Sequence, residues 1–165
     1  MQVVVADTGP INYLVLIGEI EILPRLFGRV FIPATVSIEL MRRRAPRAVK
    51  DWAERPPAWL SVETDTLLSH EDNAVSALDD GERAALELAR RLNADLLLID
   101  DRAGVAAARR KGFSVTGTLG VLDLAAGRGL VDLAASFSRL KATSFHHRPD
   151  LLDAILTRHN ERGKA

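Results

Sequence analysis

The chain has 165 residues, 47% hydrophobic and 27% charged, and its 22 basic residues balance its 22 acidic residues. This composition is ordinary for a globular protein, and the length suits one domain with a proper core. Zero net charge argues against a chain whose whole surface binds nucleic acid, although local basic patches stay possible. The lack of cysteine excludes disulfides, thiolate metal sites and cysteine nucleophiles. We expect a cytoplasmic protein with no membrane span, because an apolar strand follows Met1-Gln2 directly and no apolar run approaches the roughly 20 residues of a span.

The first part of the chain alternates short apolar strands with helices. Its patterns predict strands at residues 3–6, 30–32 and 59–63, the last as an edge strand, and helices from Pro10, at 19–27 with an interruption at Pro24, and at 34–44. Residues 64–77 are polar and weakly patterned, so we interpret them as a connection with a partial helix.

The centre of the chain predicts a helix at residues 82–93, followed by a fully buried strand at 96–99. The remainder predicts helices at 102–111, 117–126, 131–141 and 149–159, with a short strand at 113–115. This alternation indicates an α/β fold, in which a parallel sheet is covered by helices on both faces.

Acidic residues follow two of the predicted buried strands. Asp7 comes after the first strand, and Asp100 and Asp101 come after the strand at 96–99. Open α/β sheets bind their ligands at these strand ends. Glu82 falls within the apolar arc of its helix, where a carboxylate without a partner is costly. Crowded carboxylates resist ionisation together unless a cation is present, so the pattern favours a Mg²⁺-type site.

Each acid also has an ordinary structural explanation. Asp7 is a suitable helix N-cap, Asp79 and Glu82 have capping-box spacing, and Asp100 or Asp101 is placed to cap the next helix. Periodicity alone favours a surface ion pair between Glu39 and the arginines that follow it. The densest basic run of the chain consists of Arg42, Arg43, Arg44, Arg47 and Lys50. Such a run is usually a solvated helix face, but beside an acidic site it could also contact a phosphate backbone.

Other catalytic motifs are missing from the sequence. It has no HExxH motif, no glycine-rich phosphate loop and no Gly-x-Ser-x-Gly elbow. The four histidines form no pattern, and we assign them no role. A phospho-acceptor domain would place paired acids after the first strand and a lysine in residues 114–120, and neither is found. A haloacid-type phosphatase would need a second Asp two residues after Asp7.

Four short motifs, in order along the chain, resemble those of PIN-domain proteins, and more closely the branch related to VapC-type toxins. They are Asp7-Thr8-Gly9-Pro10, Asp79-Asp80-Gly81-Glu82, Leu98-Ile99-Asp100-Asp101-Arg102 and Gly117-Thr118-Leu119-Gly120-Val121-Leu122. The resemblance covers residues 1 to about 140. It implies a three-layer α/β/α sandwich with a central parallel sheet, an Mg²⁺ or Mn²⁺ site and an RNA substrate. We therefore expect one PIN-like domain over residues 1–165, with a helical extension at about 141–165.

By motif position, the resemblance assigns the four acids of the site to Asp7, Glu39, Glu82 and Asp101. Glu82 stands where VapC-type toxins often have Asp, and Asp100 is an alternative ligand to Asp101. The resemblance further implies that Thr8, Asn12 and Thr118 orient ligands or phosphate, and we assign Arg42, Arg43 and Arg47 to the RNA backbone.

The expected activity is metal-dependent endoribonuclease cleavage that leaves a 5′-phosphate and a 3′-hydroxyl. The family also suggests a toxin–antitoxin pair, a cognate antitoxin protein and a homodimer. The alternative is a PIN-fold binding module with weak or no turnover, acting through protein or RNA partners.

Overall fold

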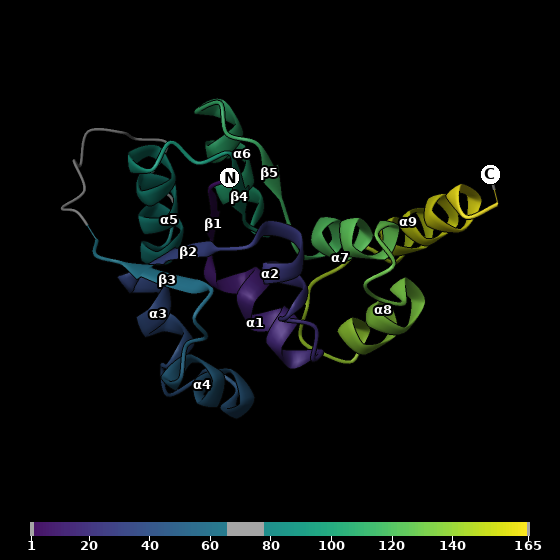
Figure 1. The fold of residues 1–165 in the computed structure, drawn as a ribbon, viewed down its shortest axis with the longest axis horizontal. Helices are drawn as coiled ribbons and strands as arrows, with labels where there is room; N and C mark the ends of the chain where they lie inside the picture. Colours follow the sequence, from purple (N-terminus) through teal and green to yellow (C-terminus); the bar gives the residue numbers. More distant parts are fainter. Residues whose placement is uncertain (1, 66–77, 165) are drawn as a thin grey trace.

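A five-stranded parallel sheet lies at the centre of the computed structural model, which describes residues 2–65 and 78–164 (Figure 1). In the order β3-β2-β1-β4-β5, the strands are Leu60–Glu63, Val30–Pro33, Val4–Ala6, Leu96–Leu98 and Val115–Thr116. The predicted parallel sheet and the edge position of the third strand are confirmed. The partial helix expected within 64–77 falls almost entirely outside the described residues.

Helices cover both faces of this sheet, which confirms the α/β/α sandwich. In the described residues they are α1 (Thr8–Leu16), α2 (Ile22–Phe27), α3 (Ala34–Leu40), α4 (Arg47–Glu54), α5 (Asp80–Arg91), α6 (Arg102–Arg110), α7 (Thr118–Gly127), α8 (Leu133–Lys141) and α9 (Pro149–Arg162). None of the helices in this part of the chain is long and apolar enough to cross a membrane.

The inner strands are apolar throughout because both of their faces are buried. Val4 and Ala6 of β1 join a hydrophobic cluster with α1, α2 and α7, whereas Val5 joins a separate cluster with α5 and α6. In β4, Leu98 belongs to the first cluster and Leu97 to the second. Successive side chains of a strand point to opposite faces, so the unbroken apolar runs of the sequence supply both layers of the core.

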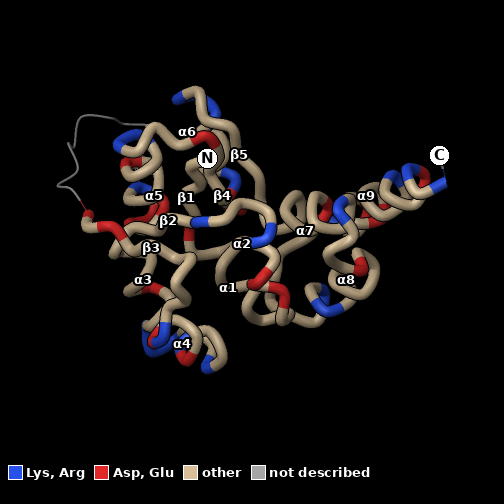
Figure 2. The backbone as a smooth tube through the Cα atoms, in the orientation of Figure 1, with Lys and Arg blue, Asp and Glu red and all other residues tan. Residues whose placement is uncertain are grey.

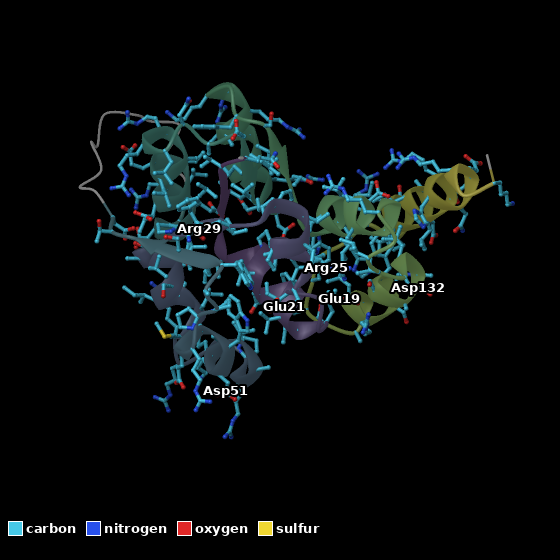
Figure 3. The ribbon with its side chains drawn as sticks, in the orientation of Figure 1. Glu19, Glu21, Arg25, Arg29, Asp51 and Asp132 are labelled. Carbon is cyan, nitrogen blue, oxygen red and sulfur yellow. The ribbon has the colours of Figure 1, made fainter. Side chains whose placement is uncertain are left out.

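The C-terminal helices pack against the same core as the sheet. Phe137 of α8 and Leu152 of α9 are fully buried in the cluster that contains Val4. The turn after α1 also holds α8 in place, because Arg139 donates to Glu19 Oε1 at 2.5 Å. Figure 3 labels Glu19 in this turn and Asp132, whose side chain caps α8 by accepting from the Ala135 amide at 3.0 Å.

Two helix predictions were wrong in their extent. The helix expected at 34–44 ends at Leu40, and a separate α4 follows from Arg47. Between them the amides of Met41, Arg42 and Ala45 bond three residues back, as in tight turns. Pro46 then disfavours helical geometry at the residue before it, which divides the arginine run. Pro24 does not interrupt a longer helix, since α2 begins at Ile22 and accommodates the proline in its first turn.

We predict that Leu152→Ala lowers the free energy of unfolding by about 2–5 kcal/mol, because it opens a cavity where α9 meets the core. Urea denaturation measures this change. The matched control is Leu151→Ala, whose side chain is 45% exposed and whose loss should matter by only about 0.5 kcal/mol. Equal effects of the two changes would show that α9 does not pack as described.

Candidate active site

The acids that follow β1 and β4 lie together at the carboxyl ends of these two neighbouring strands. The two strands are parallel, and Ala6 is in register with Leu98. One residue further on, the Asp7 amide donates to the Leu98 carbonyl at 2.9 Å, so the pairing continues to the first acid. The strand order reverses between β1 and β4. The crevice at the carboxyl ends of these two strands is the usual ligand position of an open α/β sheet.

Asp7 is the most deeply buried of the acids at these strand ends. It is 7% exposed, and its Oδ1 is buried without a hydrogen-bond partner. Burial raises its pKa from 3.8 to about 8; the Thr8 amide opposes the rise, while Asp79, Glu82 and Glu39 add to it. The structure thus holds a carboxyl group where its ionised form is unfavourable unless a cation lies nearby.

Glu82 has both of the roles that its sequence position allowed. It forms the predicted capping box, in which Asp79 accepts from the Glu82 amide at 2.8 Å and Glu82 Oε2 accepts from the Asp79 amide at 3.3 Å. It is also only 7% exposed, on the inner face of α5. Burial, and then the charges of Asp79 and Asp101, raise its pKa to about 7. Capping therefore fixes the carboxyl group beside the other acids.

Glu39 reaches the same site from α3. The Thr8 hydroxyl donates to Glu39 Oε2. The carboxylate also lies so close to Gly81 that a Cβ there would overlap it, so a larger residue at this point of α5 would displace Glu39 from its present position. Glu39 is half-buried and turned toward Thr8, unlike the surface ion pair that periodicity favoured.

The paired acids after β4 have different surroundings. Asp100 accepts from Thr118 twice, from the amide at 2.7 Å and from the hydroxyl at 2.7 Å. Burial raises the pKa of Asp100, although both bonds from Thr118 oppose the rise. A Cβ at Gly117 would lie 2.5 Å from its carboxylate, which explains the glycine before α7. Asp101 is exposed and caps α6, where its Oδ2 accepts from the Ala103 and Gly104 amides at 3.0 and 3.2 Å.

All of these acids line one groove of about 1120 Å³. We call Asp7, Glu39, Glu82 and Asp100 the acidic floor; Asn12 and Asp101 also line the groove. Basic side chains from distant parts of the sequence line it as well, and these are Arg42, Arg44, Arg102 and Arg148, together with His146 and His147. Figure 2 shows the basic residues that gather in the turn between α3 and α4.

The basic lining differs in part from the sequence-based assignment. Arg42 lines the groove together with Arg44, which the assignment left out. Arg43 and Arg47 are not among the lining residues of the described chain, and Arg47 instead faces Asp51 at 3.9 Å in a highly exposed pair. Their contact with RNA stays a prediction. Sequence reasoning gave His146 and His147 no role; their one local signal is the adjacent Arg148, which extends them into a basic run.

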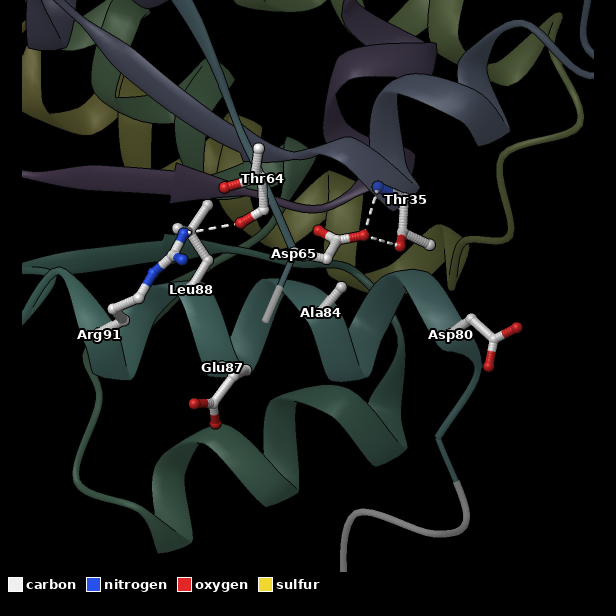
Figure 4. A pocket seen from close by; sticks show the side chains of 8 residues that line it. All are labelled: Thr35, Thr64, Asp65, Asp80, Ala84, Glu87, Leu88 and Arg91. Carbon is white, nitrogen blue, oxygen red and sulfur yellow. Dashed lines mark hydrogen bonds between the residues drawn. The ribbon is translucent and has the colours of Figure 1, made fainter. Parts of the chain in front are cut away.

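A second hollow, of about 200 Å³, lies between α3, α5 and the end of β3 (Figure 4). Here Asp65 accepts from the Thr35 amide at 3.0 Å, and Arg91 donates to the Thr64 carbonyl at 2.9 Å. These bonds hold α3 and α5 against the end of the sheet. They therefore support the two helices that carry Glu39 and Glu82.

The carboxylate oxygens of these acids are suitable ligands for a hard cation, but they are not arranged in a coordination geometry. Within residues 2–65 and 78–164, no group of three or more acids or histidines is already arranged to hold a metal ion. Three of the floor acids instead accept hydrogen bonds from within the chain: Glu39 from Thr8, Glu82 from the Asp79 amide and Asp100 from Thr118. The unpartnered buried oxygen of Asp7 is the feature that a divalent cation would satisfy.

The sequence matches the family model of the PIN domain over residues 3–161, and the chain therefore belongs to the PIN-domain family. PIN domains are usually nucleases and generally use a divalent metal ion, so the fold is that of a nuclease. A comparison with curated proteins finds no match.

We predict that Asp7→Asn stabilises the metal-free protein at high pH. Because the pKa of Asp7 rises from 3.8 to about 8 on folding, the folded chain binds more protons than the unfolded chain in that range. Its free energy of unfolding therefore falls as the pH rises from about 4 to about 8. In the variant, the part of this pH-dependent loss of stability that comes from Asp7 disappears, and the part that comes from Glu82 stays. Urea unfolding in EDTA at about pH 8 should show a gain of about 1–3 kcal/mol.

The control for this change is Asp150→Asn, at an exposed acid whose pKa is lowered by Arg148. It should give no gain at the same pH. A less stable Asp7→Asn protein would mean that the ionised Asp7 has a stabilising partner in the folded chain.

Proposed function

We propose that this PIN-domain protein is a metal-dependent endoribonuclease that hydrolyses RNA phosphodiester bonds. One observation carries the proposal: Asp7 is buried with an unpartnered oxygen among other acids, on the floor of a groove whose exposed lining includes four arginines. The separation of charge matches a phosphodiester substrate. Exposed arginines suit the phosphates that flank the reacting one, and the acidic floor suits a cation at the reacting phosphate.

The acids proposed to hold Mg²⁺ or Mn²⁺ are Asp7, Glu82, Asp101 and Asp100, with Glu39 completing the catalytic set. A divalent ion at this place supplies a water of lowered pKa and neutralises charge on the phosphate. Asp7 and Glu82, with pKa values of about 8 and about 7, carry protons over much of the neutral range and release them when a cation is bound.

Hydroxyl groups around the floor orient its acids. Thr8 holds Glu39, and Thr118 holds Asp100 through both its amide and its hydroxyl. Such bonds fix the direction of a carboxylate oxygen before an ion binds, and their loss commonly weakens metal affinity or activity by about 10–100-fold. We assign the orientation of the phosphate to Asn12, which lines the groove from α1.

We further propose that the protein is the toxin of a toxin–antitoxin pair in the cytoplasm, with a cognate antitoxin and a homodimeric assembly. The support is the resemblance of its motifs to the VapC-related branch. An antitoxin would act by placing a peptide or helix near the acidic groove.

The alternative is a PIN-fold binding module with weak turnover. One observation favours it: Glu39, Glu82, Asp100 and Asp101 all have hydrogen-bond partners within the chain, so that binding an ion requires some of these bonds to be exchanged.

We expect RNA cleavage with Mn²⁺ that stops in EDTA. Asp7→Asn should reduce kcat/KM by more than about 100-fold, because it removes a proposed metal ligand, and Thr8→Val by about 10–100-fold, because it releases Glu39. Gel analysis of end-labelled RNA measures both, with Asp153→Asn, at an exposed acid of α9 outside the groove lining, as the unchanged control. Cleavage that survives Asp7→Asn would remove this acid from the site.

Calorimetric titration with Mn²⁺ tests the metal site without RNA. We expect binding heat in the wild-type protein, its loss in Asp101→Asn and a raised melting temperature of the bound form. Asp100→Asn in the same titration shows which acid of the pair is the main ligand. Heat that is unchanged in both variants would contradict a site at the end of β4.

A further inference from the structure

Residues 144–148 bring a basic segment from the far end of the sequence to the groove. His146, His147 and Arg148 all line it, together with Phe145. His146 and Arg148 are exposed, in contrast to the buried Asp7 and Glu82. The segment connects α8 to α9 and takes no part in the acidic floor.

This segment is fastened to α1, the helix that begins directly after Asp7. The Tyr13 and Ser144 hydroxyls hydrogen-bond at 3.2 Å, and the rings of Tyr13 and Phe145 meet edge to face with centroids 5.0 Å apart. The Phe145 amide also donates to the Thr143 hydroxyl at 3.1 Å. Basic groups on the segment therefore keep a set position relative to the floor.

The polar groups of the segment suit an anionic ligand. The ring of His147 is oriented by a 3.1 Å bond between its Nδ1 and the Phe145 carbonyl, and because a carbonyl only accepts, Nδ1 carries the proton. Arg148 pairs with Asp150 at 3.1 Å, but both side chains are more than half exposed. Such a surface pair contributes little and is readily exchanged for a phosphate.

Electrostatic repulsion opposes the binding of an RNA strand in this groove. The acidic floor repels phosphates, so a strand needs cations on either side of the reacting position in addition to any metal ion. Arg42 and Arg44 line the groove from the turn between α3 and α4, and Arg148 adds a cation from elsewhere in the chain, with His146 and His147 beside it as hydrogen-bonding groups.

We propose that His146, His147 and Arg148 form a second phosphate-contacting surface. This surface binds the RNA strand in addition to the arginines of the α3–α4 turn and is separate from them. The proposal rests on the proposed function for its substrate, but binding is measurable without cleavage. In this proposal these residues position the strand and take no part in the chemistry at the floor acids.

The test compares two variants that each lose one histidine and one arginine. His146→Gln/Arg148→Gln changes the groove, and Arg158→Gln/His159→Gln makes the same change on α9, outside the groove lining. Fluorescence anisotropy with a short labelled single-stranded RNA in EDTA gives the Kd over a salt series. The groove variant should bind about 10-fold more weakly, with a salt slope smaller by about 0.7 for each lost phosphate contact.

Kinetics with Mn²⁺ complete the test, and the groove variant should show a raised KM with an unchanged kcat. Equal behaviour of the two variants overturns the proposal, even where the wild-type protein cleaves RNA. Selective loss of binding in the groove variant supports it, even where no cleavage is detected and the nuclease function fails. A wild-type protein that binds no RNA overturns both.

Discussion

The site depends first on the parallel pairing of β1 with β4. The register that joins Ala6 to Leu98 continues through the Asp7 amide, so acids more than ninety positions apart emerge side by side. A slip of one residue would turn Asp7 toward the opposite face of the sheet, because side chains alternate along a strand. The apolar runs of both strands prevent that slip, since each run fills two hydrophobic layers. Packing of the core therefore sets the geometry of the charged groups.

Crowding these acids opposes folding in the metal-free protein. Asp7 and Glu82 both have pKa values raised mainly by burial and further by neighbouring acids. The surrounding structure limits the cost with local bonds, from the capping box at Asp79 to the Thr118 contacts of Asp100. Asp7 alone among the floor acids has a buried oxygen that receives no such bond in the described structure. An unsatisfied group that persists at a site of this kind is better explained by a ligand than by stability.

Local patterns predicted the sheet, most helices and the inward direction of Glu82, because each follows from periodicity within one element. They could not decide between capping and a place in the groove for Glu82, because the same carboxylate caps α5 and lines the groove. Glu39 was misjudged by its spacing to Arg42 and gained its place from the motif resemblance. Its contact with Thr8 is made across the fold. Arg44 was named only within the basic run and His146 was given no role, because nothing local relates either residue to the acids whose groove they line.

Zero net charge is consistent with a nucleic-acid groove once the charges are placed in three dimensions. The acids of the floor are buried or half-buried, whereas Arg42, Arg44 and Arg148 are exposed around them. A phosphate approaching from solvent finds exposed arginines in the groove lining, and the field of the floor is weakened by protons held on Asp7 and Glu82. Replacing those protons by a divalent cation would leave the net charge of the floor unchanged but would concentrate positive charge at one point, where the reacting phosphate could bind. Affinity for the strand and the chemistry of cleavage can therefore reside in separate residues of one groove.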